Sequence, residues 1–218
     1  MKLIAVAAAL AALPFLGFFG PVQAKPVVGS GLVKAEVRKV PAFKSILLKG
    51  SINVKYVNSS AQKVSVSADD NLLPYIITEV KNGSLTIRYK DGSFTTKTKV
   101  LVTVNAPNIT VCASTGSGNM DIQGVGGQSF SCSLSGAGNA VVTGRVAQFN
   151  VMTNGSGSVS AEKLDAADVM ASLSGAGSIR ISASKTLTAS LSGSGSISYK
   201  GSPKITSQIS GSGKLKKL

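Results

Sequence analysis

The pentapeptide Leu-Ser-Gly-Ala-Gly stands at residues 134–138 and again at 173–177, and Leu-Ser-Gly-Ser-Gly stands at 191–195. These are the fullest copies of a motif, two glycines around one small residue, that occurs six times between residues 116 and 213. Successive first glycines are 20, 19, 20, 18 and 18 residues apart. A fixed period of this length is typical of stacked units, each of which buries its apolar face against its neighbours.

Apolar or small residues stand at fixed distances from the first glycine of each copy. They lie six, four and two residues before it and four residues after it, and mostly polar residues separate them. In the second copy these positions hold Phe130, Cys132, Leu134 and Ala140. The alternation has a period of two and predicts a half-buried strand on both sides of the motif. The sequence therefore predicts an all-β fold, a right-handed parallel β-helix (β-solenoid) with about six Gly-x-Gly rungs.

The glycines of the motif are expected to form the corner between two strands of a rung. Glycine adopts positive φ without steric cost, and its missing side chain lets neighbouring backbones approach closely. A phosphate-binding loop with similar glycine spacing would need a helix after it, and no helical periodicity follows here. The predicted structural turns are Gly116, Gly118, Gly136, Gly138, Gly155, Gly157, Gly175, Gly177, Gly193, Gly195, Gly211 and Gly213.

Residues 25–110 show strand patterns but no repeat. Asp69, Asp70 and Asn71 are candidates for capping a short helical turn that follows them. We expect this region to begin the solenoid and cover its first rung, with the repeats in 111–218 and the signal peptide described below in 1–24. The predicted strands, separated by turn-forming residues, are 51–57, 63–67, 84–89 and 99–105.

The first 24 residues have the layout of a secretory signal peptide. Met1 and Lys2 precede an unbroken apolar run from Leu3 to Phe19, and Val22 and Ala24 occupy the small-residue positions of a cleavage site. A membrane anchor is the less favoured interpretation, because 17 residues reach only the short end of a spanning helix. Cleavage after Ala24 would export the mature chain to the periplasm, the outer-membrane surface or the extracellular space, with no further transmembrane span.

Cys112 and Cys132 occupy the same position in two successive copies. Stacking would bring their Cα atoms to about 5 Å, which a disulfide accepts. An exported protein meets conditions in which disulfides persist. The sequence is compatible with a disulfide between them and also with two buried free thiols in one column.

The chain carries a formal net charge of +14, and loss of Lys2 with the signal peptide leaves +13. A charge of this size attracts anionic envelope components. Lys214, Lys216 and Lys217 alternate with leucines at residues 214–218. They are candidates for contacts to an anion, and the alternative is that they protect the edge of a sheet against further strand pairing.

The sequence gives little support for catalysis. It has no histidine, so a His-based nucleophile relay is excluded, and serine has no activating base. Glu162, Asp165 and Asp168 fall close together, but their spacing favours a solvated surface over a cation site. The position of Asp121 is not acidic in the later copies, so no ladder of acids forms. We expect no enzyme activity, no cofactor and no metal.

Several segments resemble the secreted bacterial DUF2807 family, also called the putative auto-transporter adhesin head, or GIN, domain. They are Ser-Ala-Asp-Asp-Asn-Leu-Leu at 67–73, Val80–Ile87 with Gly83, Val-Thr-Val-Asn-Ala-Pro at 102–107 and the Ser-Gly-Ser/Ala-Gly blocks. The resemblance covers about residues 43–213. It implies a right-handed β-helix exported by a Gram-negative bacterium, and it implies adhesion by analogy with the family name.

The expected function is therefore that of an exported, non-enzymatic β-helix protein that is adhesin-like or binds an envelope glycan. Its expected partner is an anionic envelope glycan, lipopolysaccharide or a cell-surface component. Nucleic acid is not expected, because the compartment and the 5% aromatic content argue against it. A structural, self-associating envelope protein is the alternative, and a polysaccharide-cleaving β-helix enzyme is a weaker one.

Overall fold

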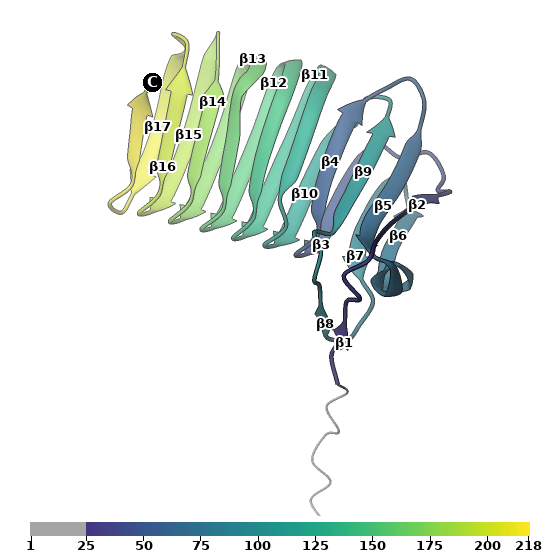
Figure 1. The fold of residues 1–218 in the computed structure, drawn as a ribbon. Helices are drawn as coiled ribbons and strands as arrows, with labels where there is room; N and C mark the ends of the chain where they lie inside the picture. Colours follow the sequence, from purple (N-terminus) through teal and green to yellow (C-terminus); the bar gives the residue numbers. More distant parts are fainter. Residues whose placement is uncertain (1–24) are drawn as a thin grey trace, which may run out of the picture.

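The computed structural model describes residues 25–218, and the predicted signal peptide at 1–24 lies outside the described residues. The strands of the second half run side by side in successive layers, as Figure 1 shows, and form a β-solenoid of about five turns. The predicted all-β solenoid is thus confirmed. No helix within residues 25–218 is long and apolar enough to cross a membrane.

Each rung has one arm before its Gly-x-Gly corner and one arm after it, and every pairing between repeat strands is parallel. The longest strands run through both a corner-leaving arm and the next corner-entering arm. The repeat strands are β10 (Val111–Gly116), β11 (Met120–Gly136), β12 (Asn139–Gly155), β13 (Ser158–Gly175), β14 (Ser178–Ser182), β15 (Thr186–Gly193), β16 (Ser196–Lys200), β17 (Lys204–Ser210) and β18 (Lys214–Lys217).

The register between rungs places equivalent positions of the repeat directly beside each other. Between β11 and β12, Phe130 pairs with Phe149 and Gly136 pairs with Gly155. The inward side chains form columns through the core, and nearly all of them are buried. The periodicity of the sequence therefore predicted both the strands and their register.

A Cβ at either glycine of a corner would collide with the backbone of the preceding rung, and the first glycine has a further constraint. The first has positive φ, for example +125° at Gly136, a conformation that L side chains rarely adopt. The second has no positive φ, but a Cβ at Gly138 would collide with the backbone carbonyl of Gly118 in the preceding rung. Both Ala137 and Gly138 donate backbone N–H groups to the carbonyl of Gly116, so the corners are hydrogen-bonded to one another along the stack.

The stack begins earlier in the chain than the glycine motif indicates. β3 (Ser45–Gly50) and β4 (Asn53–Asn58) pair in parallel with β10 and β11, and Gly116 lies directly beside Gly50. Gly50 has positive φ like the first glycine of each repeat. Ile52 replaces the second glycine, which is why this rung lacks the motif.

The remaining N-terminal strands lie beyond this first rung and include antiparallel pairs. β7 continues the sheet next to β3 and pairs with β6, whereas β9 continues it next to β4 and pairs with β5, which in turn pairs with β2. The predicted strands of this region are present within one to two residues of their expected bounds. The elements are β1 (Val27–Val28), β2 (Val33–Arg38), β5 (Lys63–Asp69), the 3-10 helix η1 (Asp70–Tyr75), β6 (Ile76–Lys81), β7 (Ser84–Tyr89), β8 (Phe94–Thr95) and β9 (Leu101–Ala106).

A short helical turn follows Asp69 as predicted, but Asp69 does not cap it. Its buried carboxylate accepts hydrogen bonds from the backbone N–H groups of Gly31, Lys97 and Thr98 instead. Asp70 is exposed and accepts a hydrogen bond from the hydroxyl of Ser30. The capping prediction was wrong for Asp69 because no local pattern indicates that two distant loops meet above it.

Candidate binding surfaces

The net positive charge is concentrated at the two ends of the solenoid. Residues 111–168, in the middle rungs, carry two basic and four acidic side chains. Residues 169–218 carry no acidic side chain. Their seven basic side chains are Arg180, Lys185, Lys200, Lys204, Lys214, Lys216 and Lys217. We call these residues the basic end.

Part of the basic end lies on one face, on the arms that follow the Gly-x-Gly corners. The register pairs Arg180 with Ser198 and Ser198 with Lys216, so the two basic side chains stand two strands apart in one outward column. This separation is about 9.5 Å. Lys214 lies on the same outward face one position along, next to Ser196. The geometry places three cations, Arg180, Lys214 and Lys216, on one outward face.

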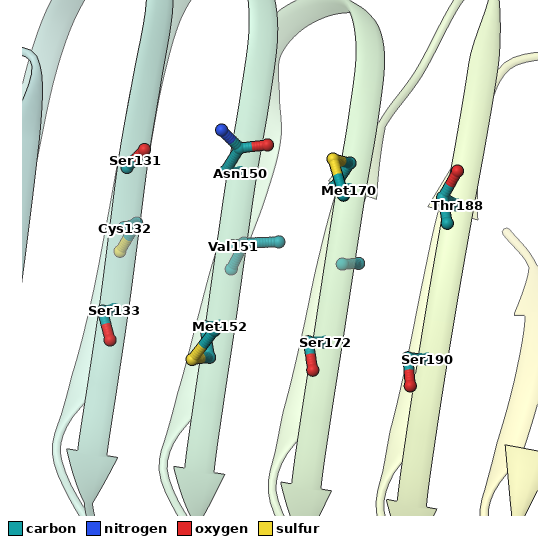
Figure 2. A pocket seen from close by; sticks show the side chains of 11 residues that line it. Ser131, Cys132, Ser133, Asn150, Val151, Met152, Met170, Ser172, Thr188 and Ser190 are labelled. Carbon is teal, nitrogen blue, oxygen red and sulfur yellow. The ribbon is translucent and has the colours of Figure 1, made fainter. Parts of the chain in front are cut away.

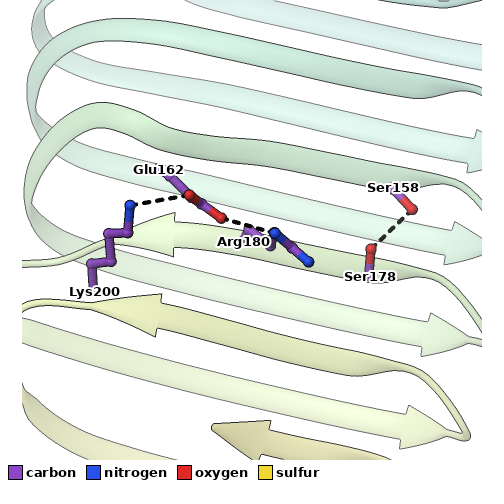
Figure 3. Close-up of polar contacts among 5 residues, drawn as sticks. All are labelled: Ser158, Glu162, Ser178, Arg180 and Lys200. Atoms are coloured by element: carbon purple, nitrogen blue, oxygen red, sulfur yellow. Dashed lines mark hydrogen bonds and ion pairs between the residues drawn. The ribbon is translucent and has the colours of Figure 1, made fainter. Parts of the chain in front are cut away.

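Glu162 is the acid that this row contacts. Its carboxylate lies 3.1 Å from Lys200 Nζ and 3.4 Å from an Arg180 guanidinium nitrogen (Figure 3). Lys200 and then Arg180 hold the pKa of this carboxyl below its ordinary value, against the opposing effect of desolvation. The Arg180 and Lys200 side chains remain 55% and 51% exposed, so both stay accessible to a second anion.

The structure places the three lysines predicted as anion contacts on the last described strand, β18, which pairs on one side with β16. All three are exposed, and Lys217 Nζ donates to the hydroxyl of Ser202 at 3.3 Å. Sequence reasoning did not connect them with Arg180 and Lys200. Arg180 and Lys216 share one position of the repeat, five residues after a first glycine, but Lys200 does not, and its link to Arg180 is their shared contact with Glu162.

The other acidic residues of the repeats make local contacts. Asp165 pairs with Arg145 at 3.1 Å, and Asp168 accepts a hydrogen bond from the Thr186 hydroxyl at 2.6 Å. Among residues 25–218 no group of three or more His, Cys, Asp or Glu side chains is placed to hold a metal ion. Glu162, Asp165 and Asp168 therefore form separate pairs with their neighbours.

A second surface differs from the basic end in having no charge. It is formed by the outward side chains one, three and five residues before the first glycine of each motif, and we call it the uncharged face. All eighteen positions lack a charged residue, and eleven hold Ser or Thr. Met152 and Met170 are exceptions in size, with 56% and 61% of their surface exposed. They lie beside a shallow hollow of about 430 Å³, which is also lined by Ser133, Asn150 and Ser172 (Figure 2).

Sequence reasoning missed these two methionines because it followed the inward columns. Their outward phase was visible, since each stands an odd number of residues before a first glycine, where most copies have Ser, Thr or Asn. An apolar residue at a polar phase of a strand is a usable signal for a surface site.

Cys112 and Cys132 are register partners on β10 and β11, and both are buried. They are free thiols in this structure. The disulfide stays a prediction for oxidising conditions.

The chain is similar to several solved structures. A putative adhesin from Bacteroides fragilis NCTC 9343 is 24% identical with a TM-score of 0.73, over 88% of this chain and 100% of that one. A putative lipid binding protein from Parabacteroides distasonis ATCC 8503 is 25% identical with a TM-score of 0.55, over 89% and 100%. A putative adhesin from Parabacteroides merdae ATCC 43184 is 19% identical with a TM-score of 0.57, over 89% and 100%. No curated protein matches the sequence.

The family model described as "Putative auto-transporter adhesin, head GIN domain" (DUF2807) matches residues 42–203. The match begins just before β3 and ends between β16 and β17, so it spans the first rung, its cover and most of the repeats. The resemblance read from the sequence is thereby confirmed, and the chain belongs to the DUF2807 family.

Proposed function

We propose that this is an exported, non-enzymatic binding protein whose basic end attaches to an anionic component of a bacterial envelope, in the manner of an adhesin. The observation that carries the proposal is the absence of any acidic side chain from residues 169–218, where seven basic ones stand. Export is supported by the signal-peptide pattern at residues 1–24. The names of the family and of the similar structures support an adhesin-type role.

The arrangement of the cations favours a ligand with repeated negative charges. Arg180 and Lys216 share one column at a spacing of about 9.5 Å, with Lys200 on the intervening strand β16 and Lys214 on the same strand as Lys216. The rigid sheet fixes the separation of the strands that carry these residues, so binding has to order only the side chains themselves. Lipopolysaccharide phosphates or the carboxylates of an acidic glycan supply charges in such series. We therefore expect binding to an anionic polymer or lipid headgroup array to be stronger than binding to single ions.

The experiment is a titration of residues 25–218 with lipopolysaccharide and with a neutral polysaccharide at low and high salt. The Lys214/Lys216/Lys217→Ser variant should bind lipopolysaccharide at least about tenfold more weakly. The Lys39/Lys44/Lys63→Ser variant removes the same charge from exposed positions of the N-terminal half, so it controls for net charge. An equal loss in both variants would show that binding follows overall charge alone, and the proposed site would be wrong.

The same variant tests the alternative of a self-associating structural protein. If the lysines of β18 protect a sheet edge, their removal should promote end-to-end association. Sedimentation velocity of the Lys214/Lys216/Lys217→Ser variant reports this directly. Larger species in the variant would favour edge protection, whereas unchanged sedimentation with weakened lipopolysaccharide binding would favour the anion contacts.

A further inference from the structure

We infer that the uncharged face binds an uncharged, hydroxyl-rich polysaccharide across the hollow beside Met152 and Met170. This surface lies on the arms before the Gly-x-Gly corners, whereas Arg180, Lys214 and Lys216 lie on the arms after them. The inference goes beyond the proposed function and does not rest on it.

The lack of charged residues on this face limits the ligands that it can bind. Residues 111–218 carry nine basic and four acidic side chains, yet none of these stands at the eighteen outward positions of this face. Such a surface offers an ionic ligand nothing to pair with. Binding a charged polymer here would remove the charges from water without compensation. The face is therefore suited to a neutral partner.

The hollow beside Met152 and Met170 offers apolar contacts to a ligand. Met170 lies beside Asn150 and Met152 lies beside Ser172 in the register of β12 and β13, so the two methionines are diagonal neighbours. Met152 lies between Ser133 and Ser172, and Met170 lies between Asn150 and Thr188 (Figure 2). The thioether side chain is flexible and polarisable and adapts to irregular apolar surfaces. The surface that the hollow exposes is mostly apolar, although six of its eleven lining residues are Ser, Thr or Asn.

Polar side chains surround the two methionines. Eleven of the eighteen positions carry a hydroxyl, and Asn150 and Asn154 add amides. A hydroxyl both donates and accepts a hydrogen bond by rotation, as does each hydroxyl of a sugar. A sugar ring also has apolar C–H surface, which matches the methionine side chains. A neutral sugar can therefore form hydrogen bonds with the amide and hydroxyl groups and pack its C–H surface against the methionine side chains.

Two other occupants fit less well. An extended peptide usually adds to a sheet edge, but β12 and β13 are paired on both sides, so their backbone groups are already used. A second copy of the chain packed on this face would cover six strands and the three outward residues of each strand. That area is roughly 500 Å² per partner. A stable interface needs about 800 Å² per partner. A single polymer strand needs no such area.

The test uses the methyl signals of methionine in residues 25–218 labelled with ¹³C-methyl methionine. The mature chain has three methionines, and the buried Met120 is an internal control for Met152 and Met170. The probes are dextran, mannan, laminarin and cellohexaose at about 0.5 M salt, where ionic attraction is screened. We expect at least one probe to shift the Met152 and Met170 signals saturably while the Met120 signal stays constant.

The Met152→Ser/Met170→Ser variant should lose on the order of tenfold in affinity for that probe. Val141→Ser is the matched control, because Val141 is an apolar residue 45% exposed on the arm after its corner. Absence of any methyl shift with all four neutral probes would overturn the inference. Shifts that appear on raising the protein concentration alone would assign the face to a second copy and overturn it as well.

Discussion

The carboxylate of Asp69 accepts a hydrogen bond at 2.7 Å from the backbone N–H of Gly31, which lies 38 residues earlier in the chain. It also accepts bonds from Lys97 and Thr98 at 3.1 and 3.2 Å. A Cβ at Gly29 would lie 2.5 Å from the same carboxyl group, so the N-terminal segment passes directly over it. One buried side chain thus ties three separate parts of the solenoid cover together.

This arrangement predicts a loss of stability in acid. Burial alone would raise the pKa of Asp69, but the hydrogen bonds from Gly31, Thr98 and Lys97 outweigh it and lower the pKa below its ordinary value of 3.8. A lowered pKa contributes stability that is present above 3.8 and is lost as the pH falls through the folded-state value. Thermal unfolding of Asp69→Asn should therefore change less between pH 5 and pH 2 than that of the natural protein. An equal response to pH in both proteins would contradict this, and Asp91→Asn, at an exposed position, is the control.

The two cysteines should be unreactive as long as the protein is folded and reduced. The hydrogen bond with Cys132, followed by burial, raises the pKa of the Cys112 thiol well above its ordinary value. Because the thiolate is the nucleophile, iodoacetamide should modify neither residue at neutral pH until the protein unfolds. Rapid modification of the folded protein would show that the column opens readily.

Export to an oxidising compartment should form a disulfide between the same two cysteines. The register places them directly opposite each other, and a bridge closing about 20 residues would stabilise the protein by about 3 kcal/mol. Intact mass spectrometry of the exported protein should show a loss of two hydrogens. A mass with two free thiols would establish the alternative of a buried thiol pair.

Alanine substitutions at three glycines should separate the two requirements of the corners. Gly138→Ala places a Cβ against the carbonyl of Gly118 in the rung below, and we expect a loss of about 2–3 kcal/mol in the free energy of unfolding. Gly127→Ala has φ of +113° but no atom within 4 Å of the new Cβ, and should cost about 1 kcal/mol. Gly126→Ala, with neither constraint, should be tolerated. Urea unfolding measures all three, and equal values at Gly126 and Gly138 would refute the role of close approach.

Thr153 offers a stabilising substitution. It is fully buried between Leu134 and Leu173 in a core column, and its hydroxyl has no hydrogen-bond partner. Valine has the same shape without the unsatisfied group, so Thr153→Val should stabilise the protein by about 1–2 kcal/mol. Thr188→Val, at an exposed position two strands away, controls for strand propensity. Equal effects of the two substitutions would contradict the explanation.

The repeat half of the fold could be predicted because each column of the core is visible as a period in the sequence. The pairing of Phe130 with Phe149 could be predicted because each stands six residues before the first glycine of its motif. Residues 25–110 were expected to begin the solenoid, but the corner of the first rung was not located, since Ile52 stands where the repeat has glycine, although Gly50 forms the same corner. The contacts of Asp69 were also missed, because bonds to backbone groups of distant loops leave no periodic trace.

The candidate surfaces show the same division. The lysines of β18 could be read as a basic run, but their alignment with Arg180 depends on which residues share an outward column. Met152 and Met170 were visible as apolar residues at a polar phase, yet only the register shows that they are neighbours. Sequence periodicity predicts which way a side chain points and its neighbours within one column, whereas diagonal neighbours and contacts such as those of Glu162 depend on the three-dimensional structure.

We propose that the solenoid has two separate binding surfaces, one for anions and one for neutral glycans. The most direct measurement is a crossed titration of two variants, Lys214/Lys216/Lys217→Ser and Met152→Ser/Met170→Ser, with lipopolysaccharide and with the neutral polysaccharide selected by the methyl shifts. We predict that the lysine variant loses lipopolysaccharide binding and keeps the neutral polymer, and that the methionine variant does the reverse. Loss of both ligands in either variant would show a single shared site and contradict the account.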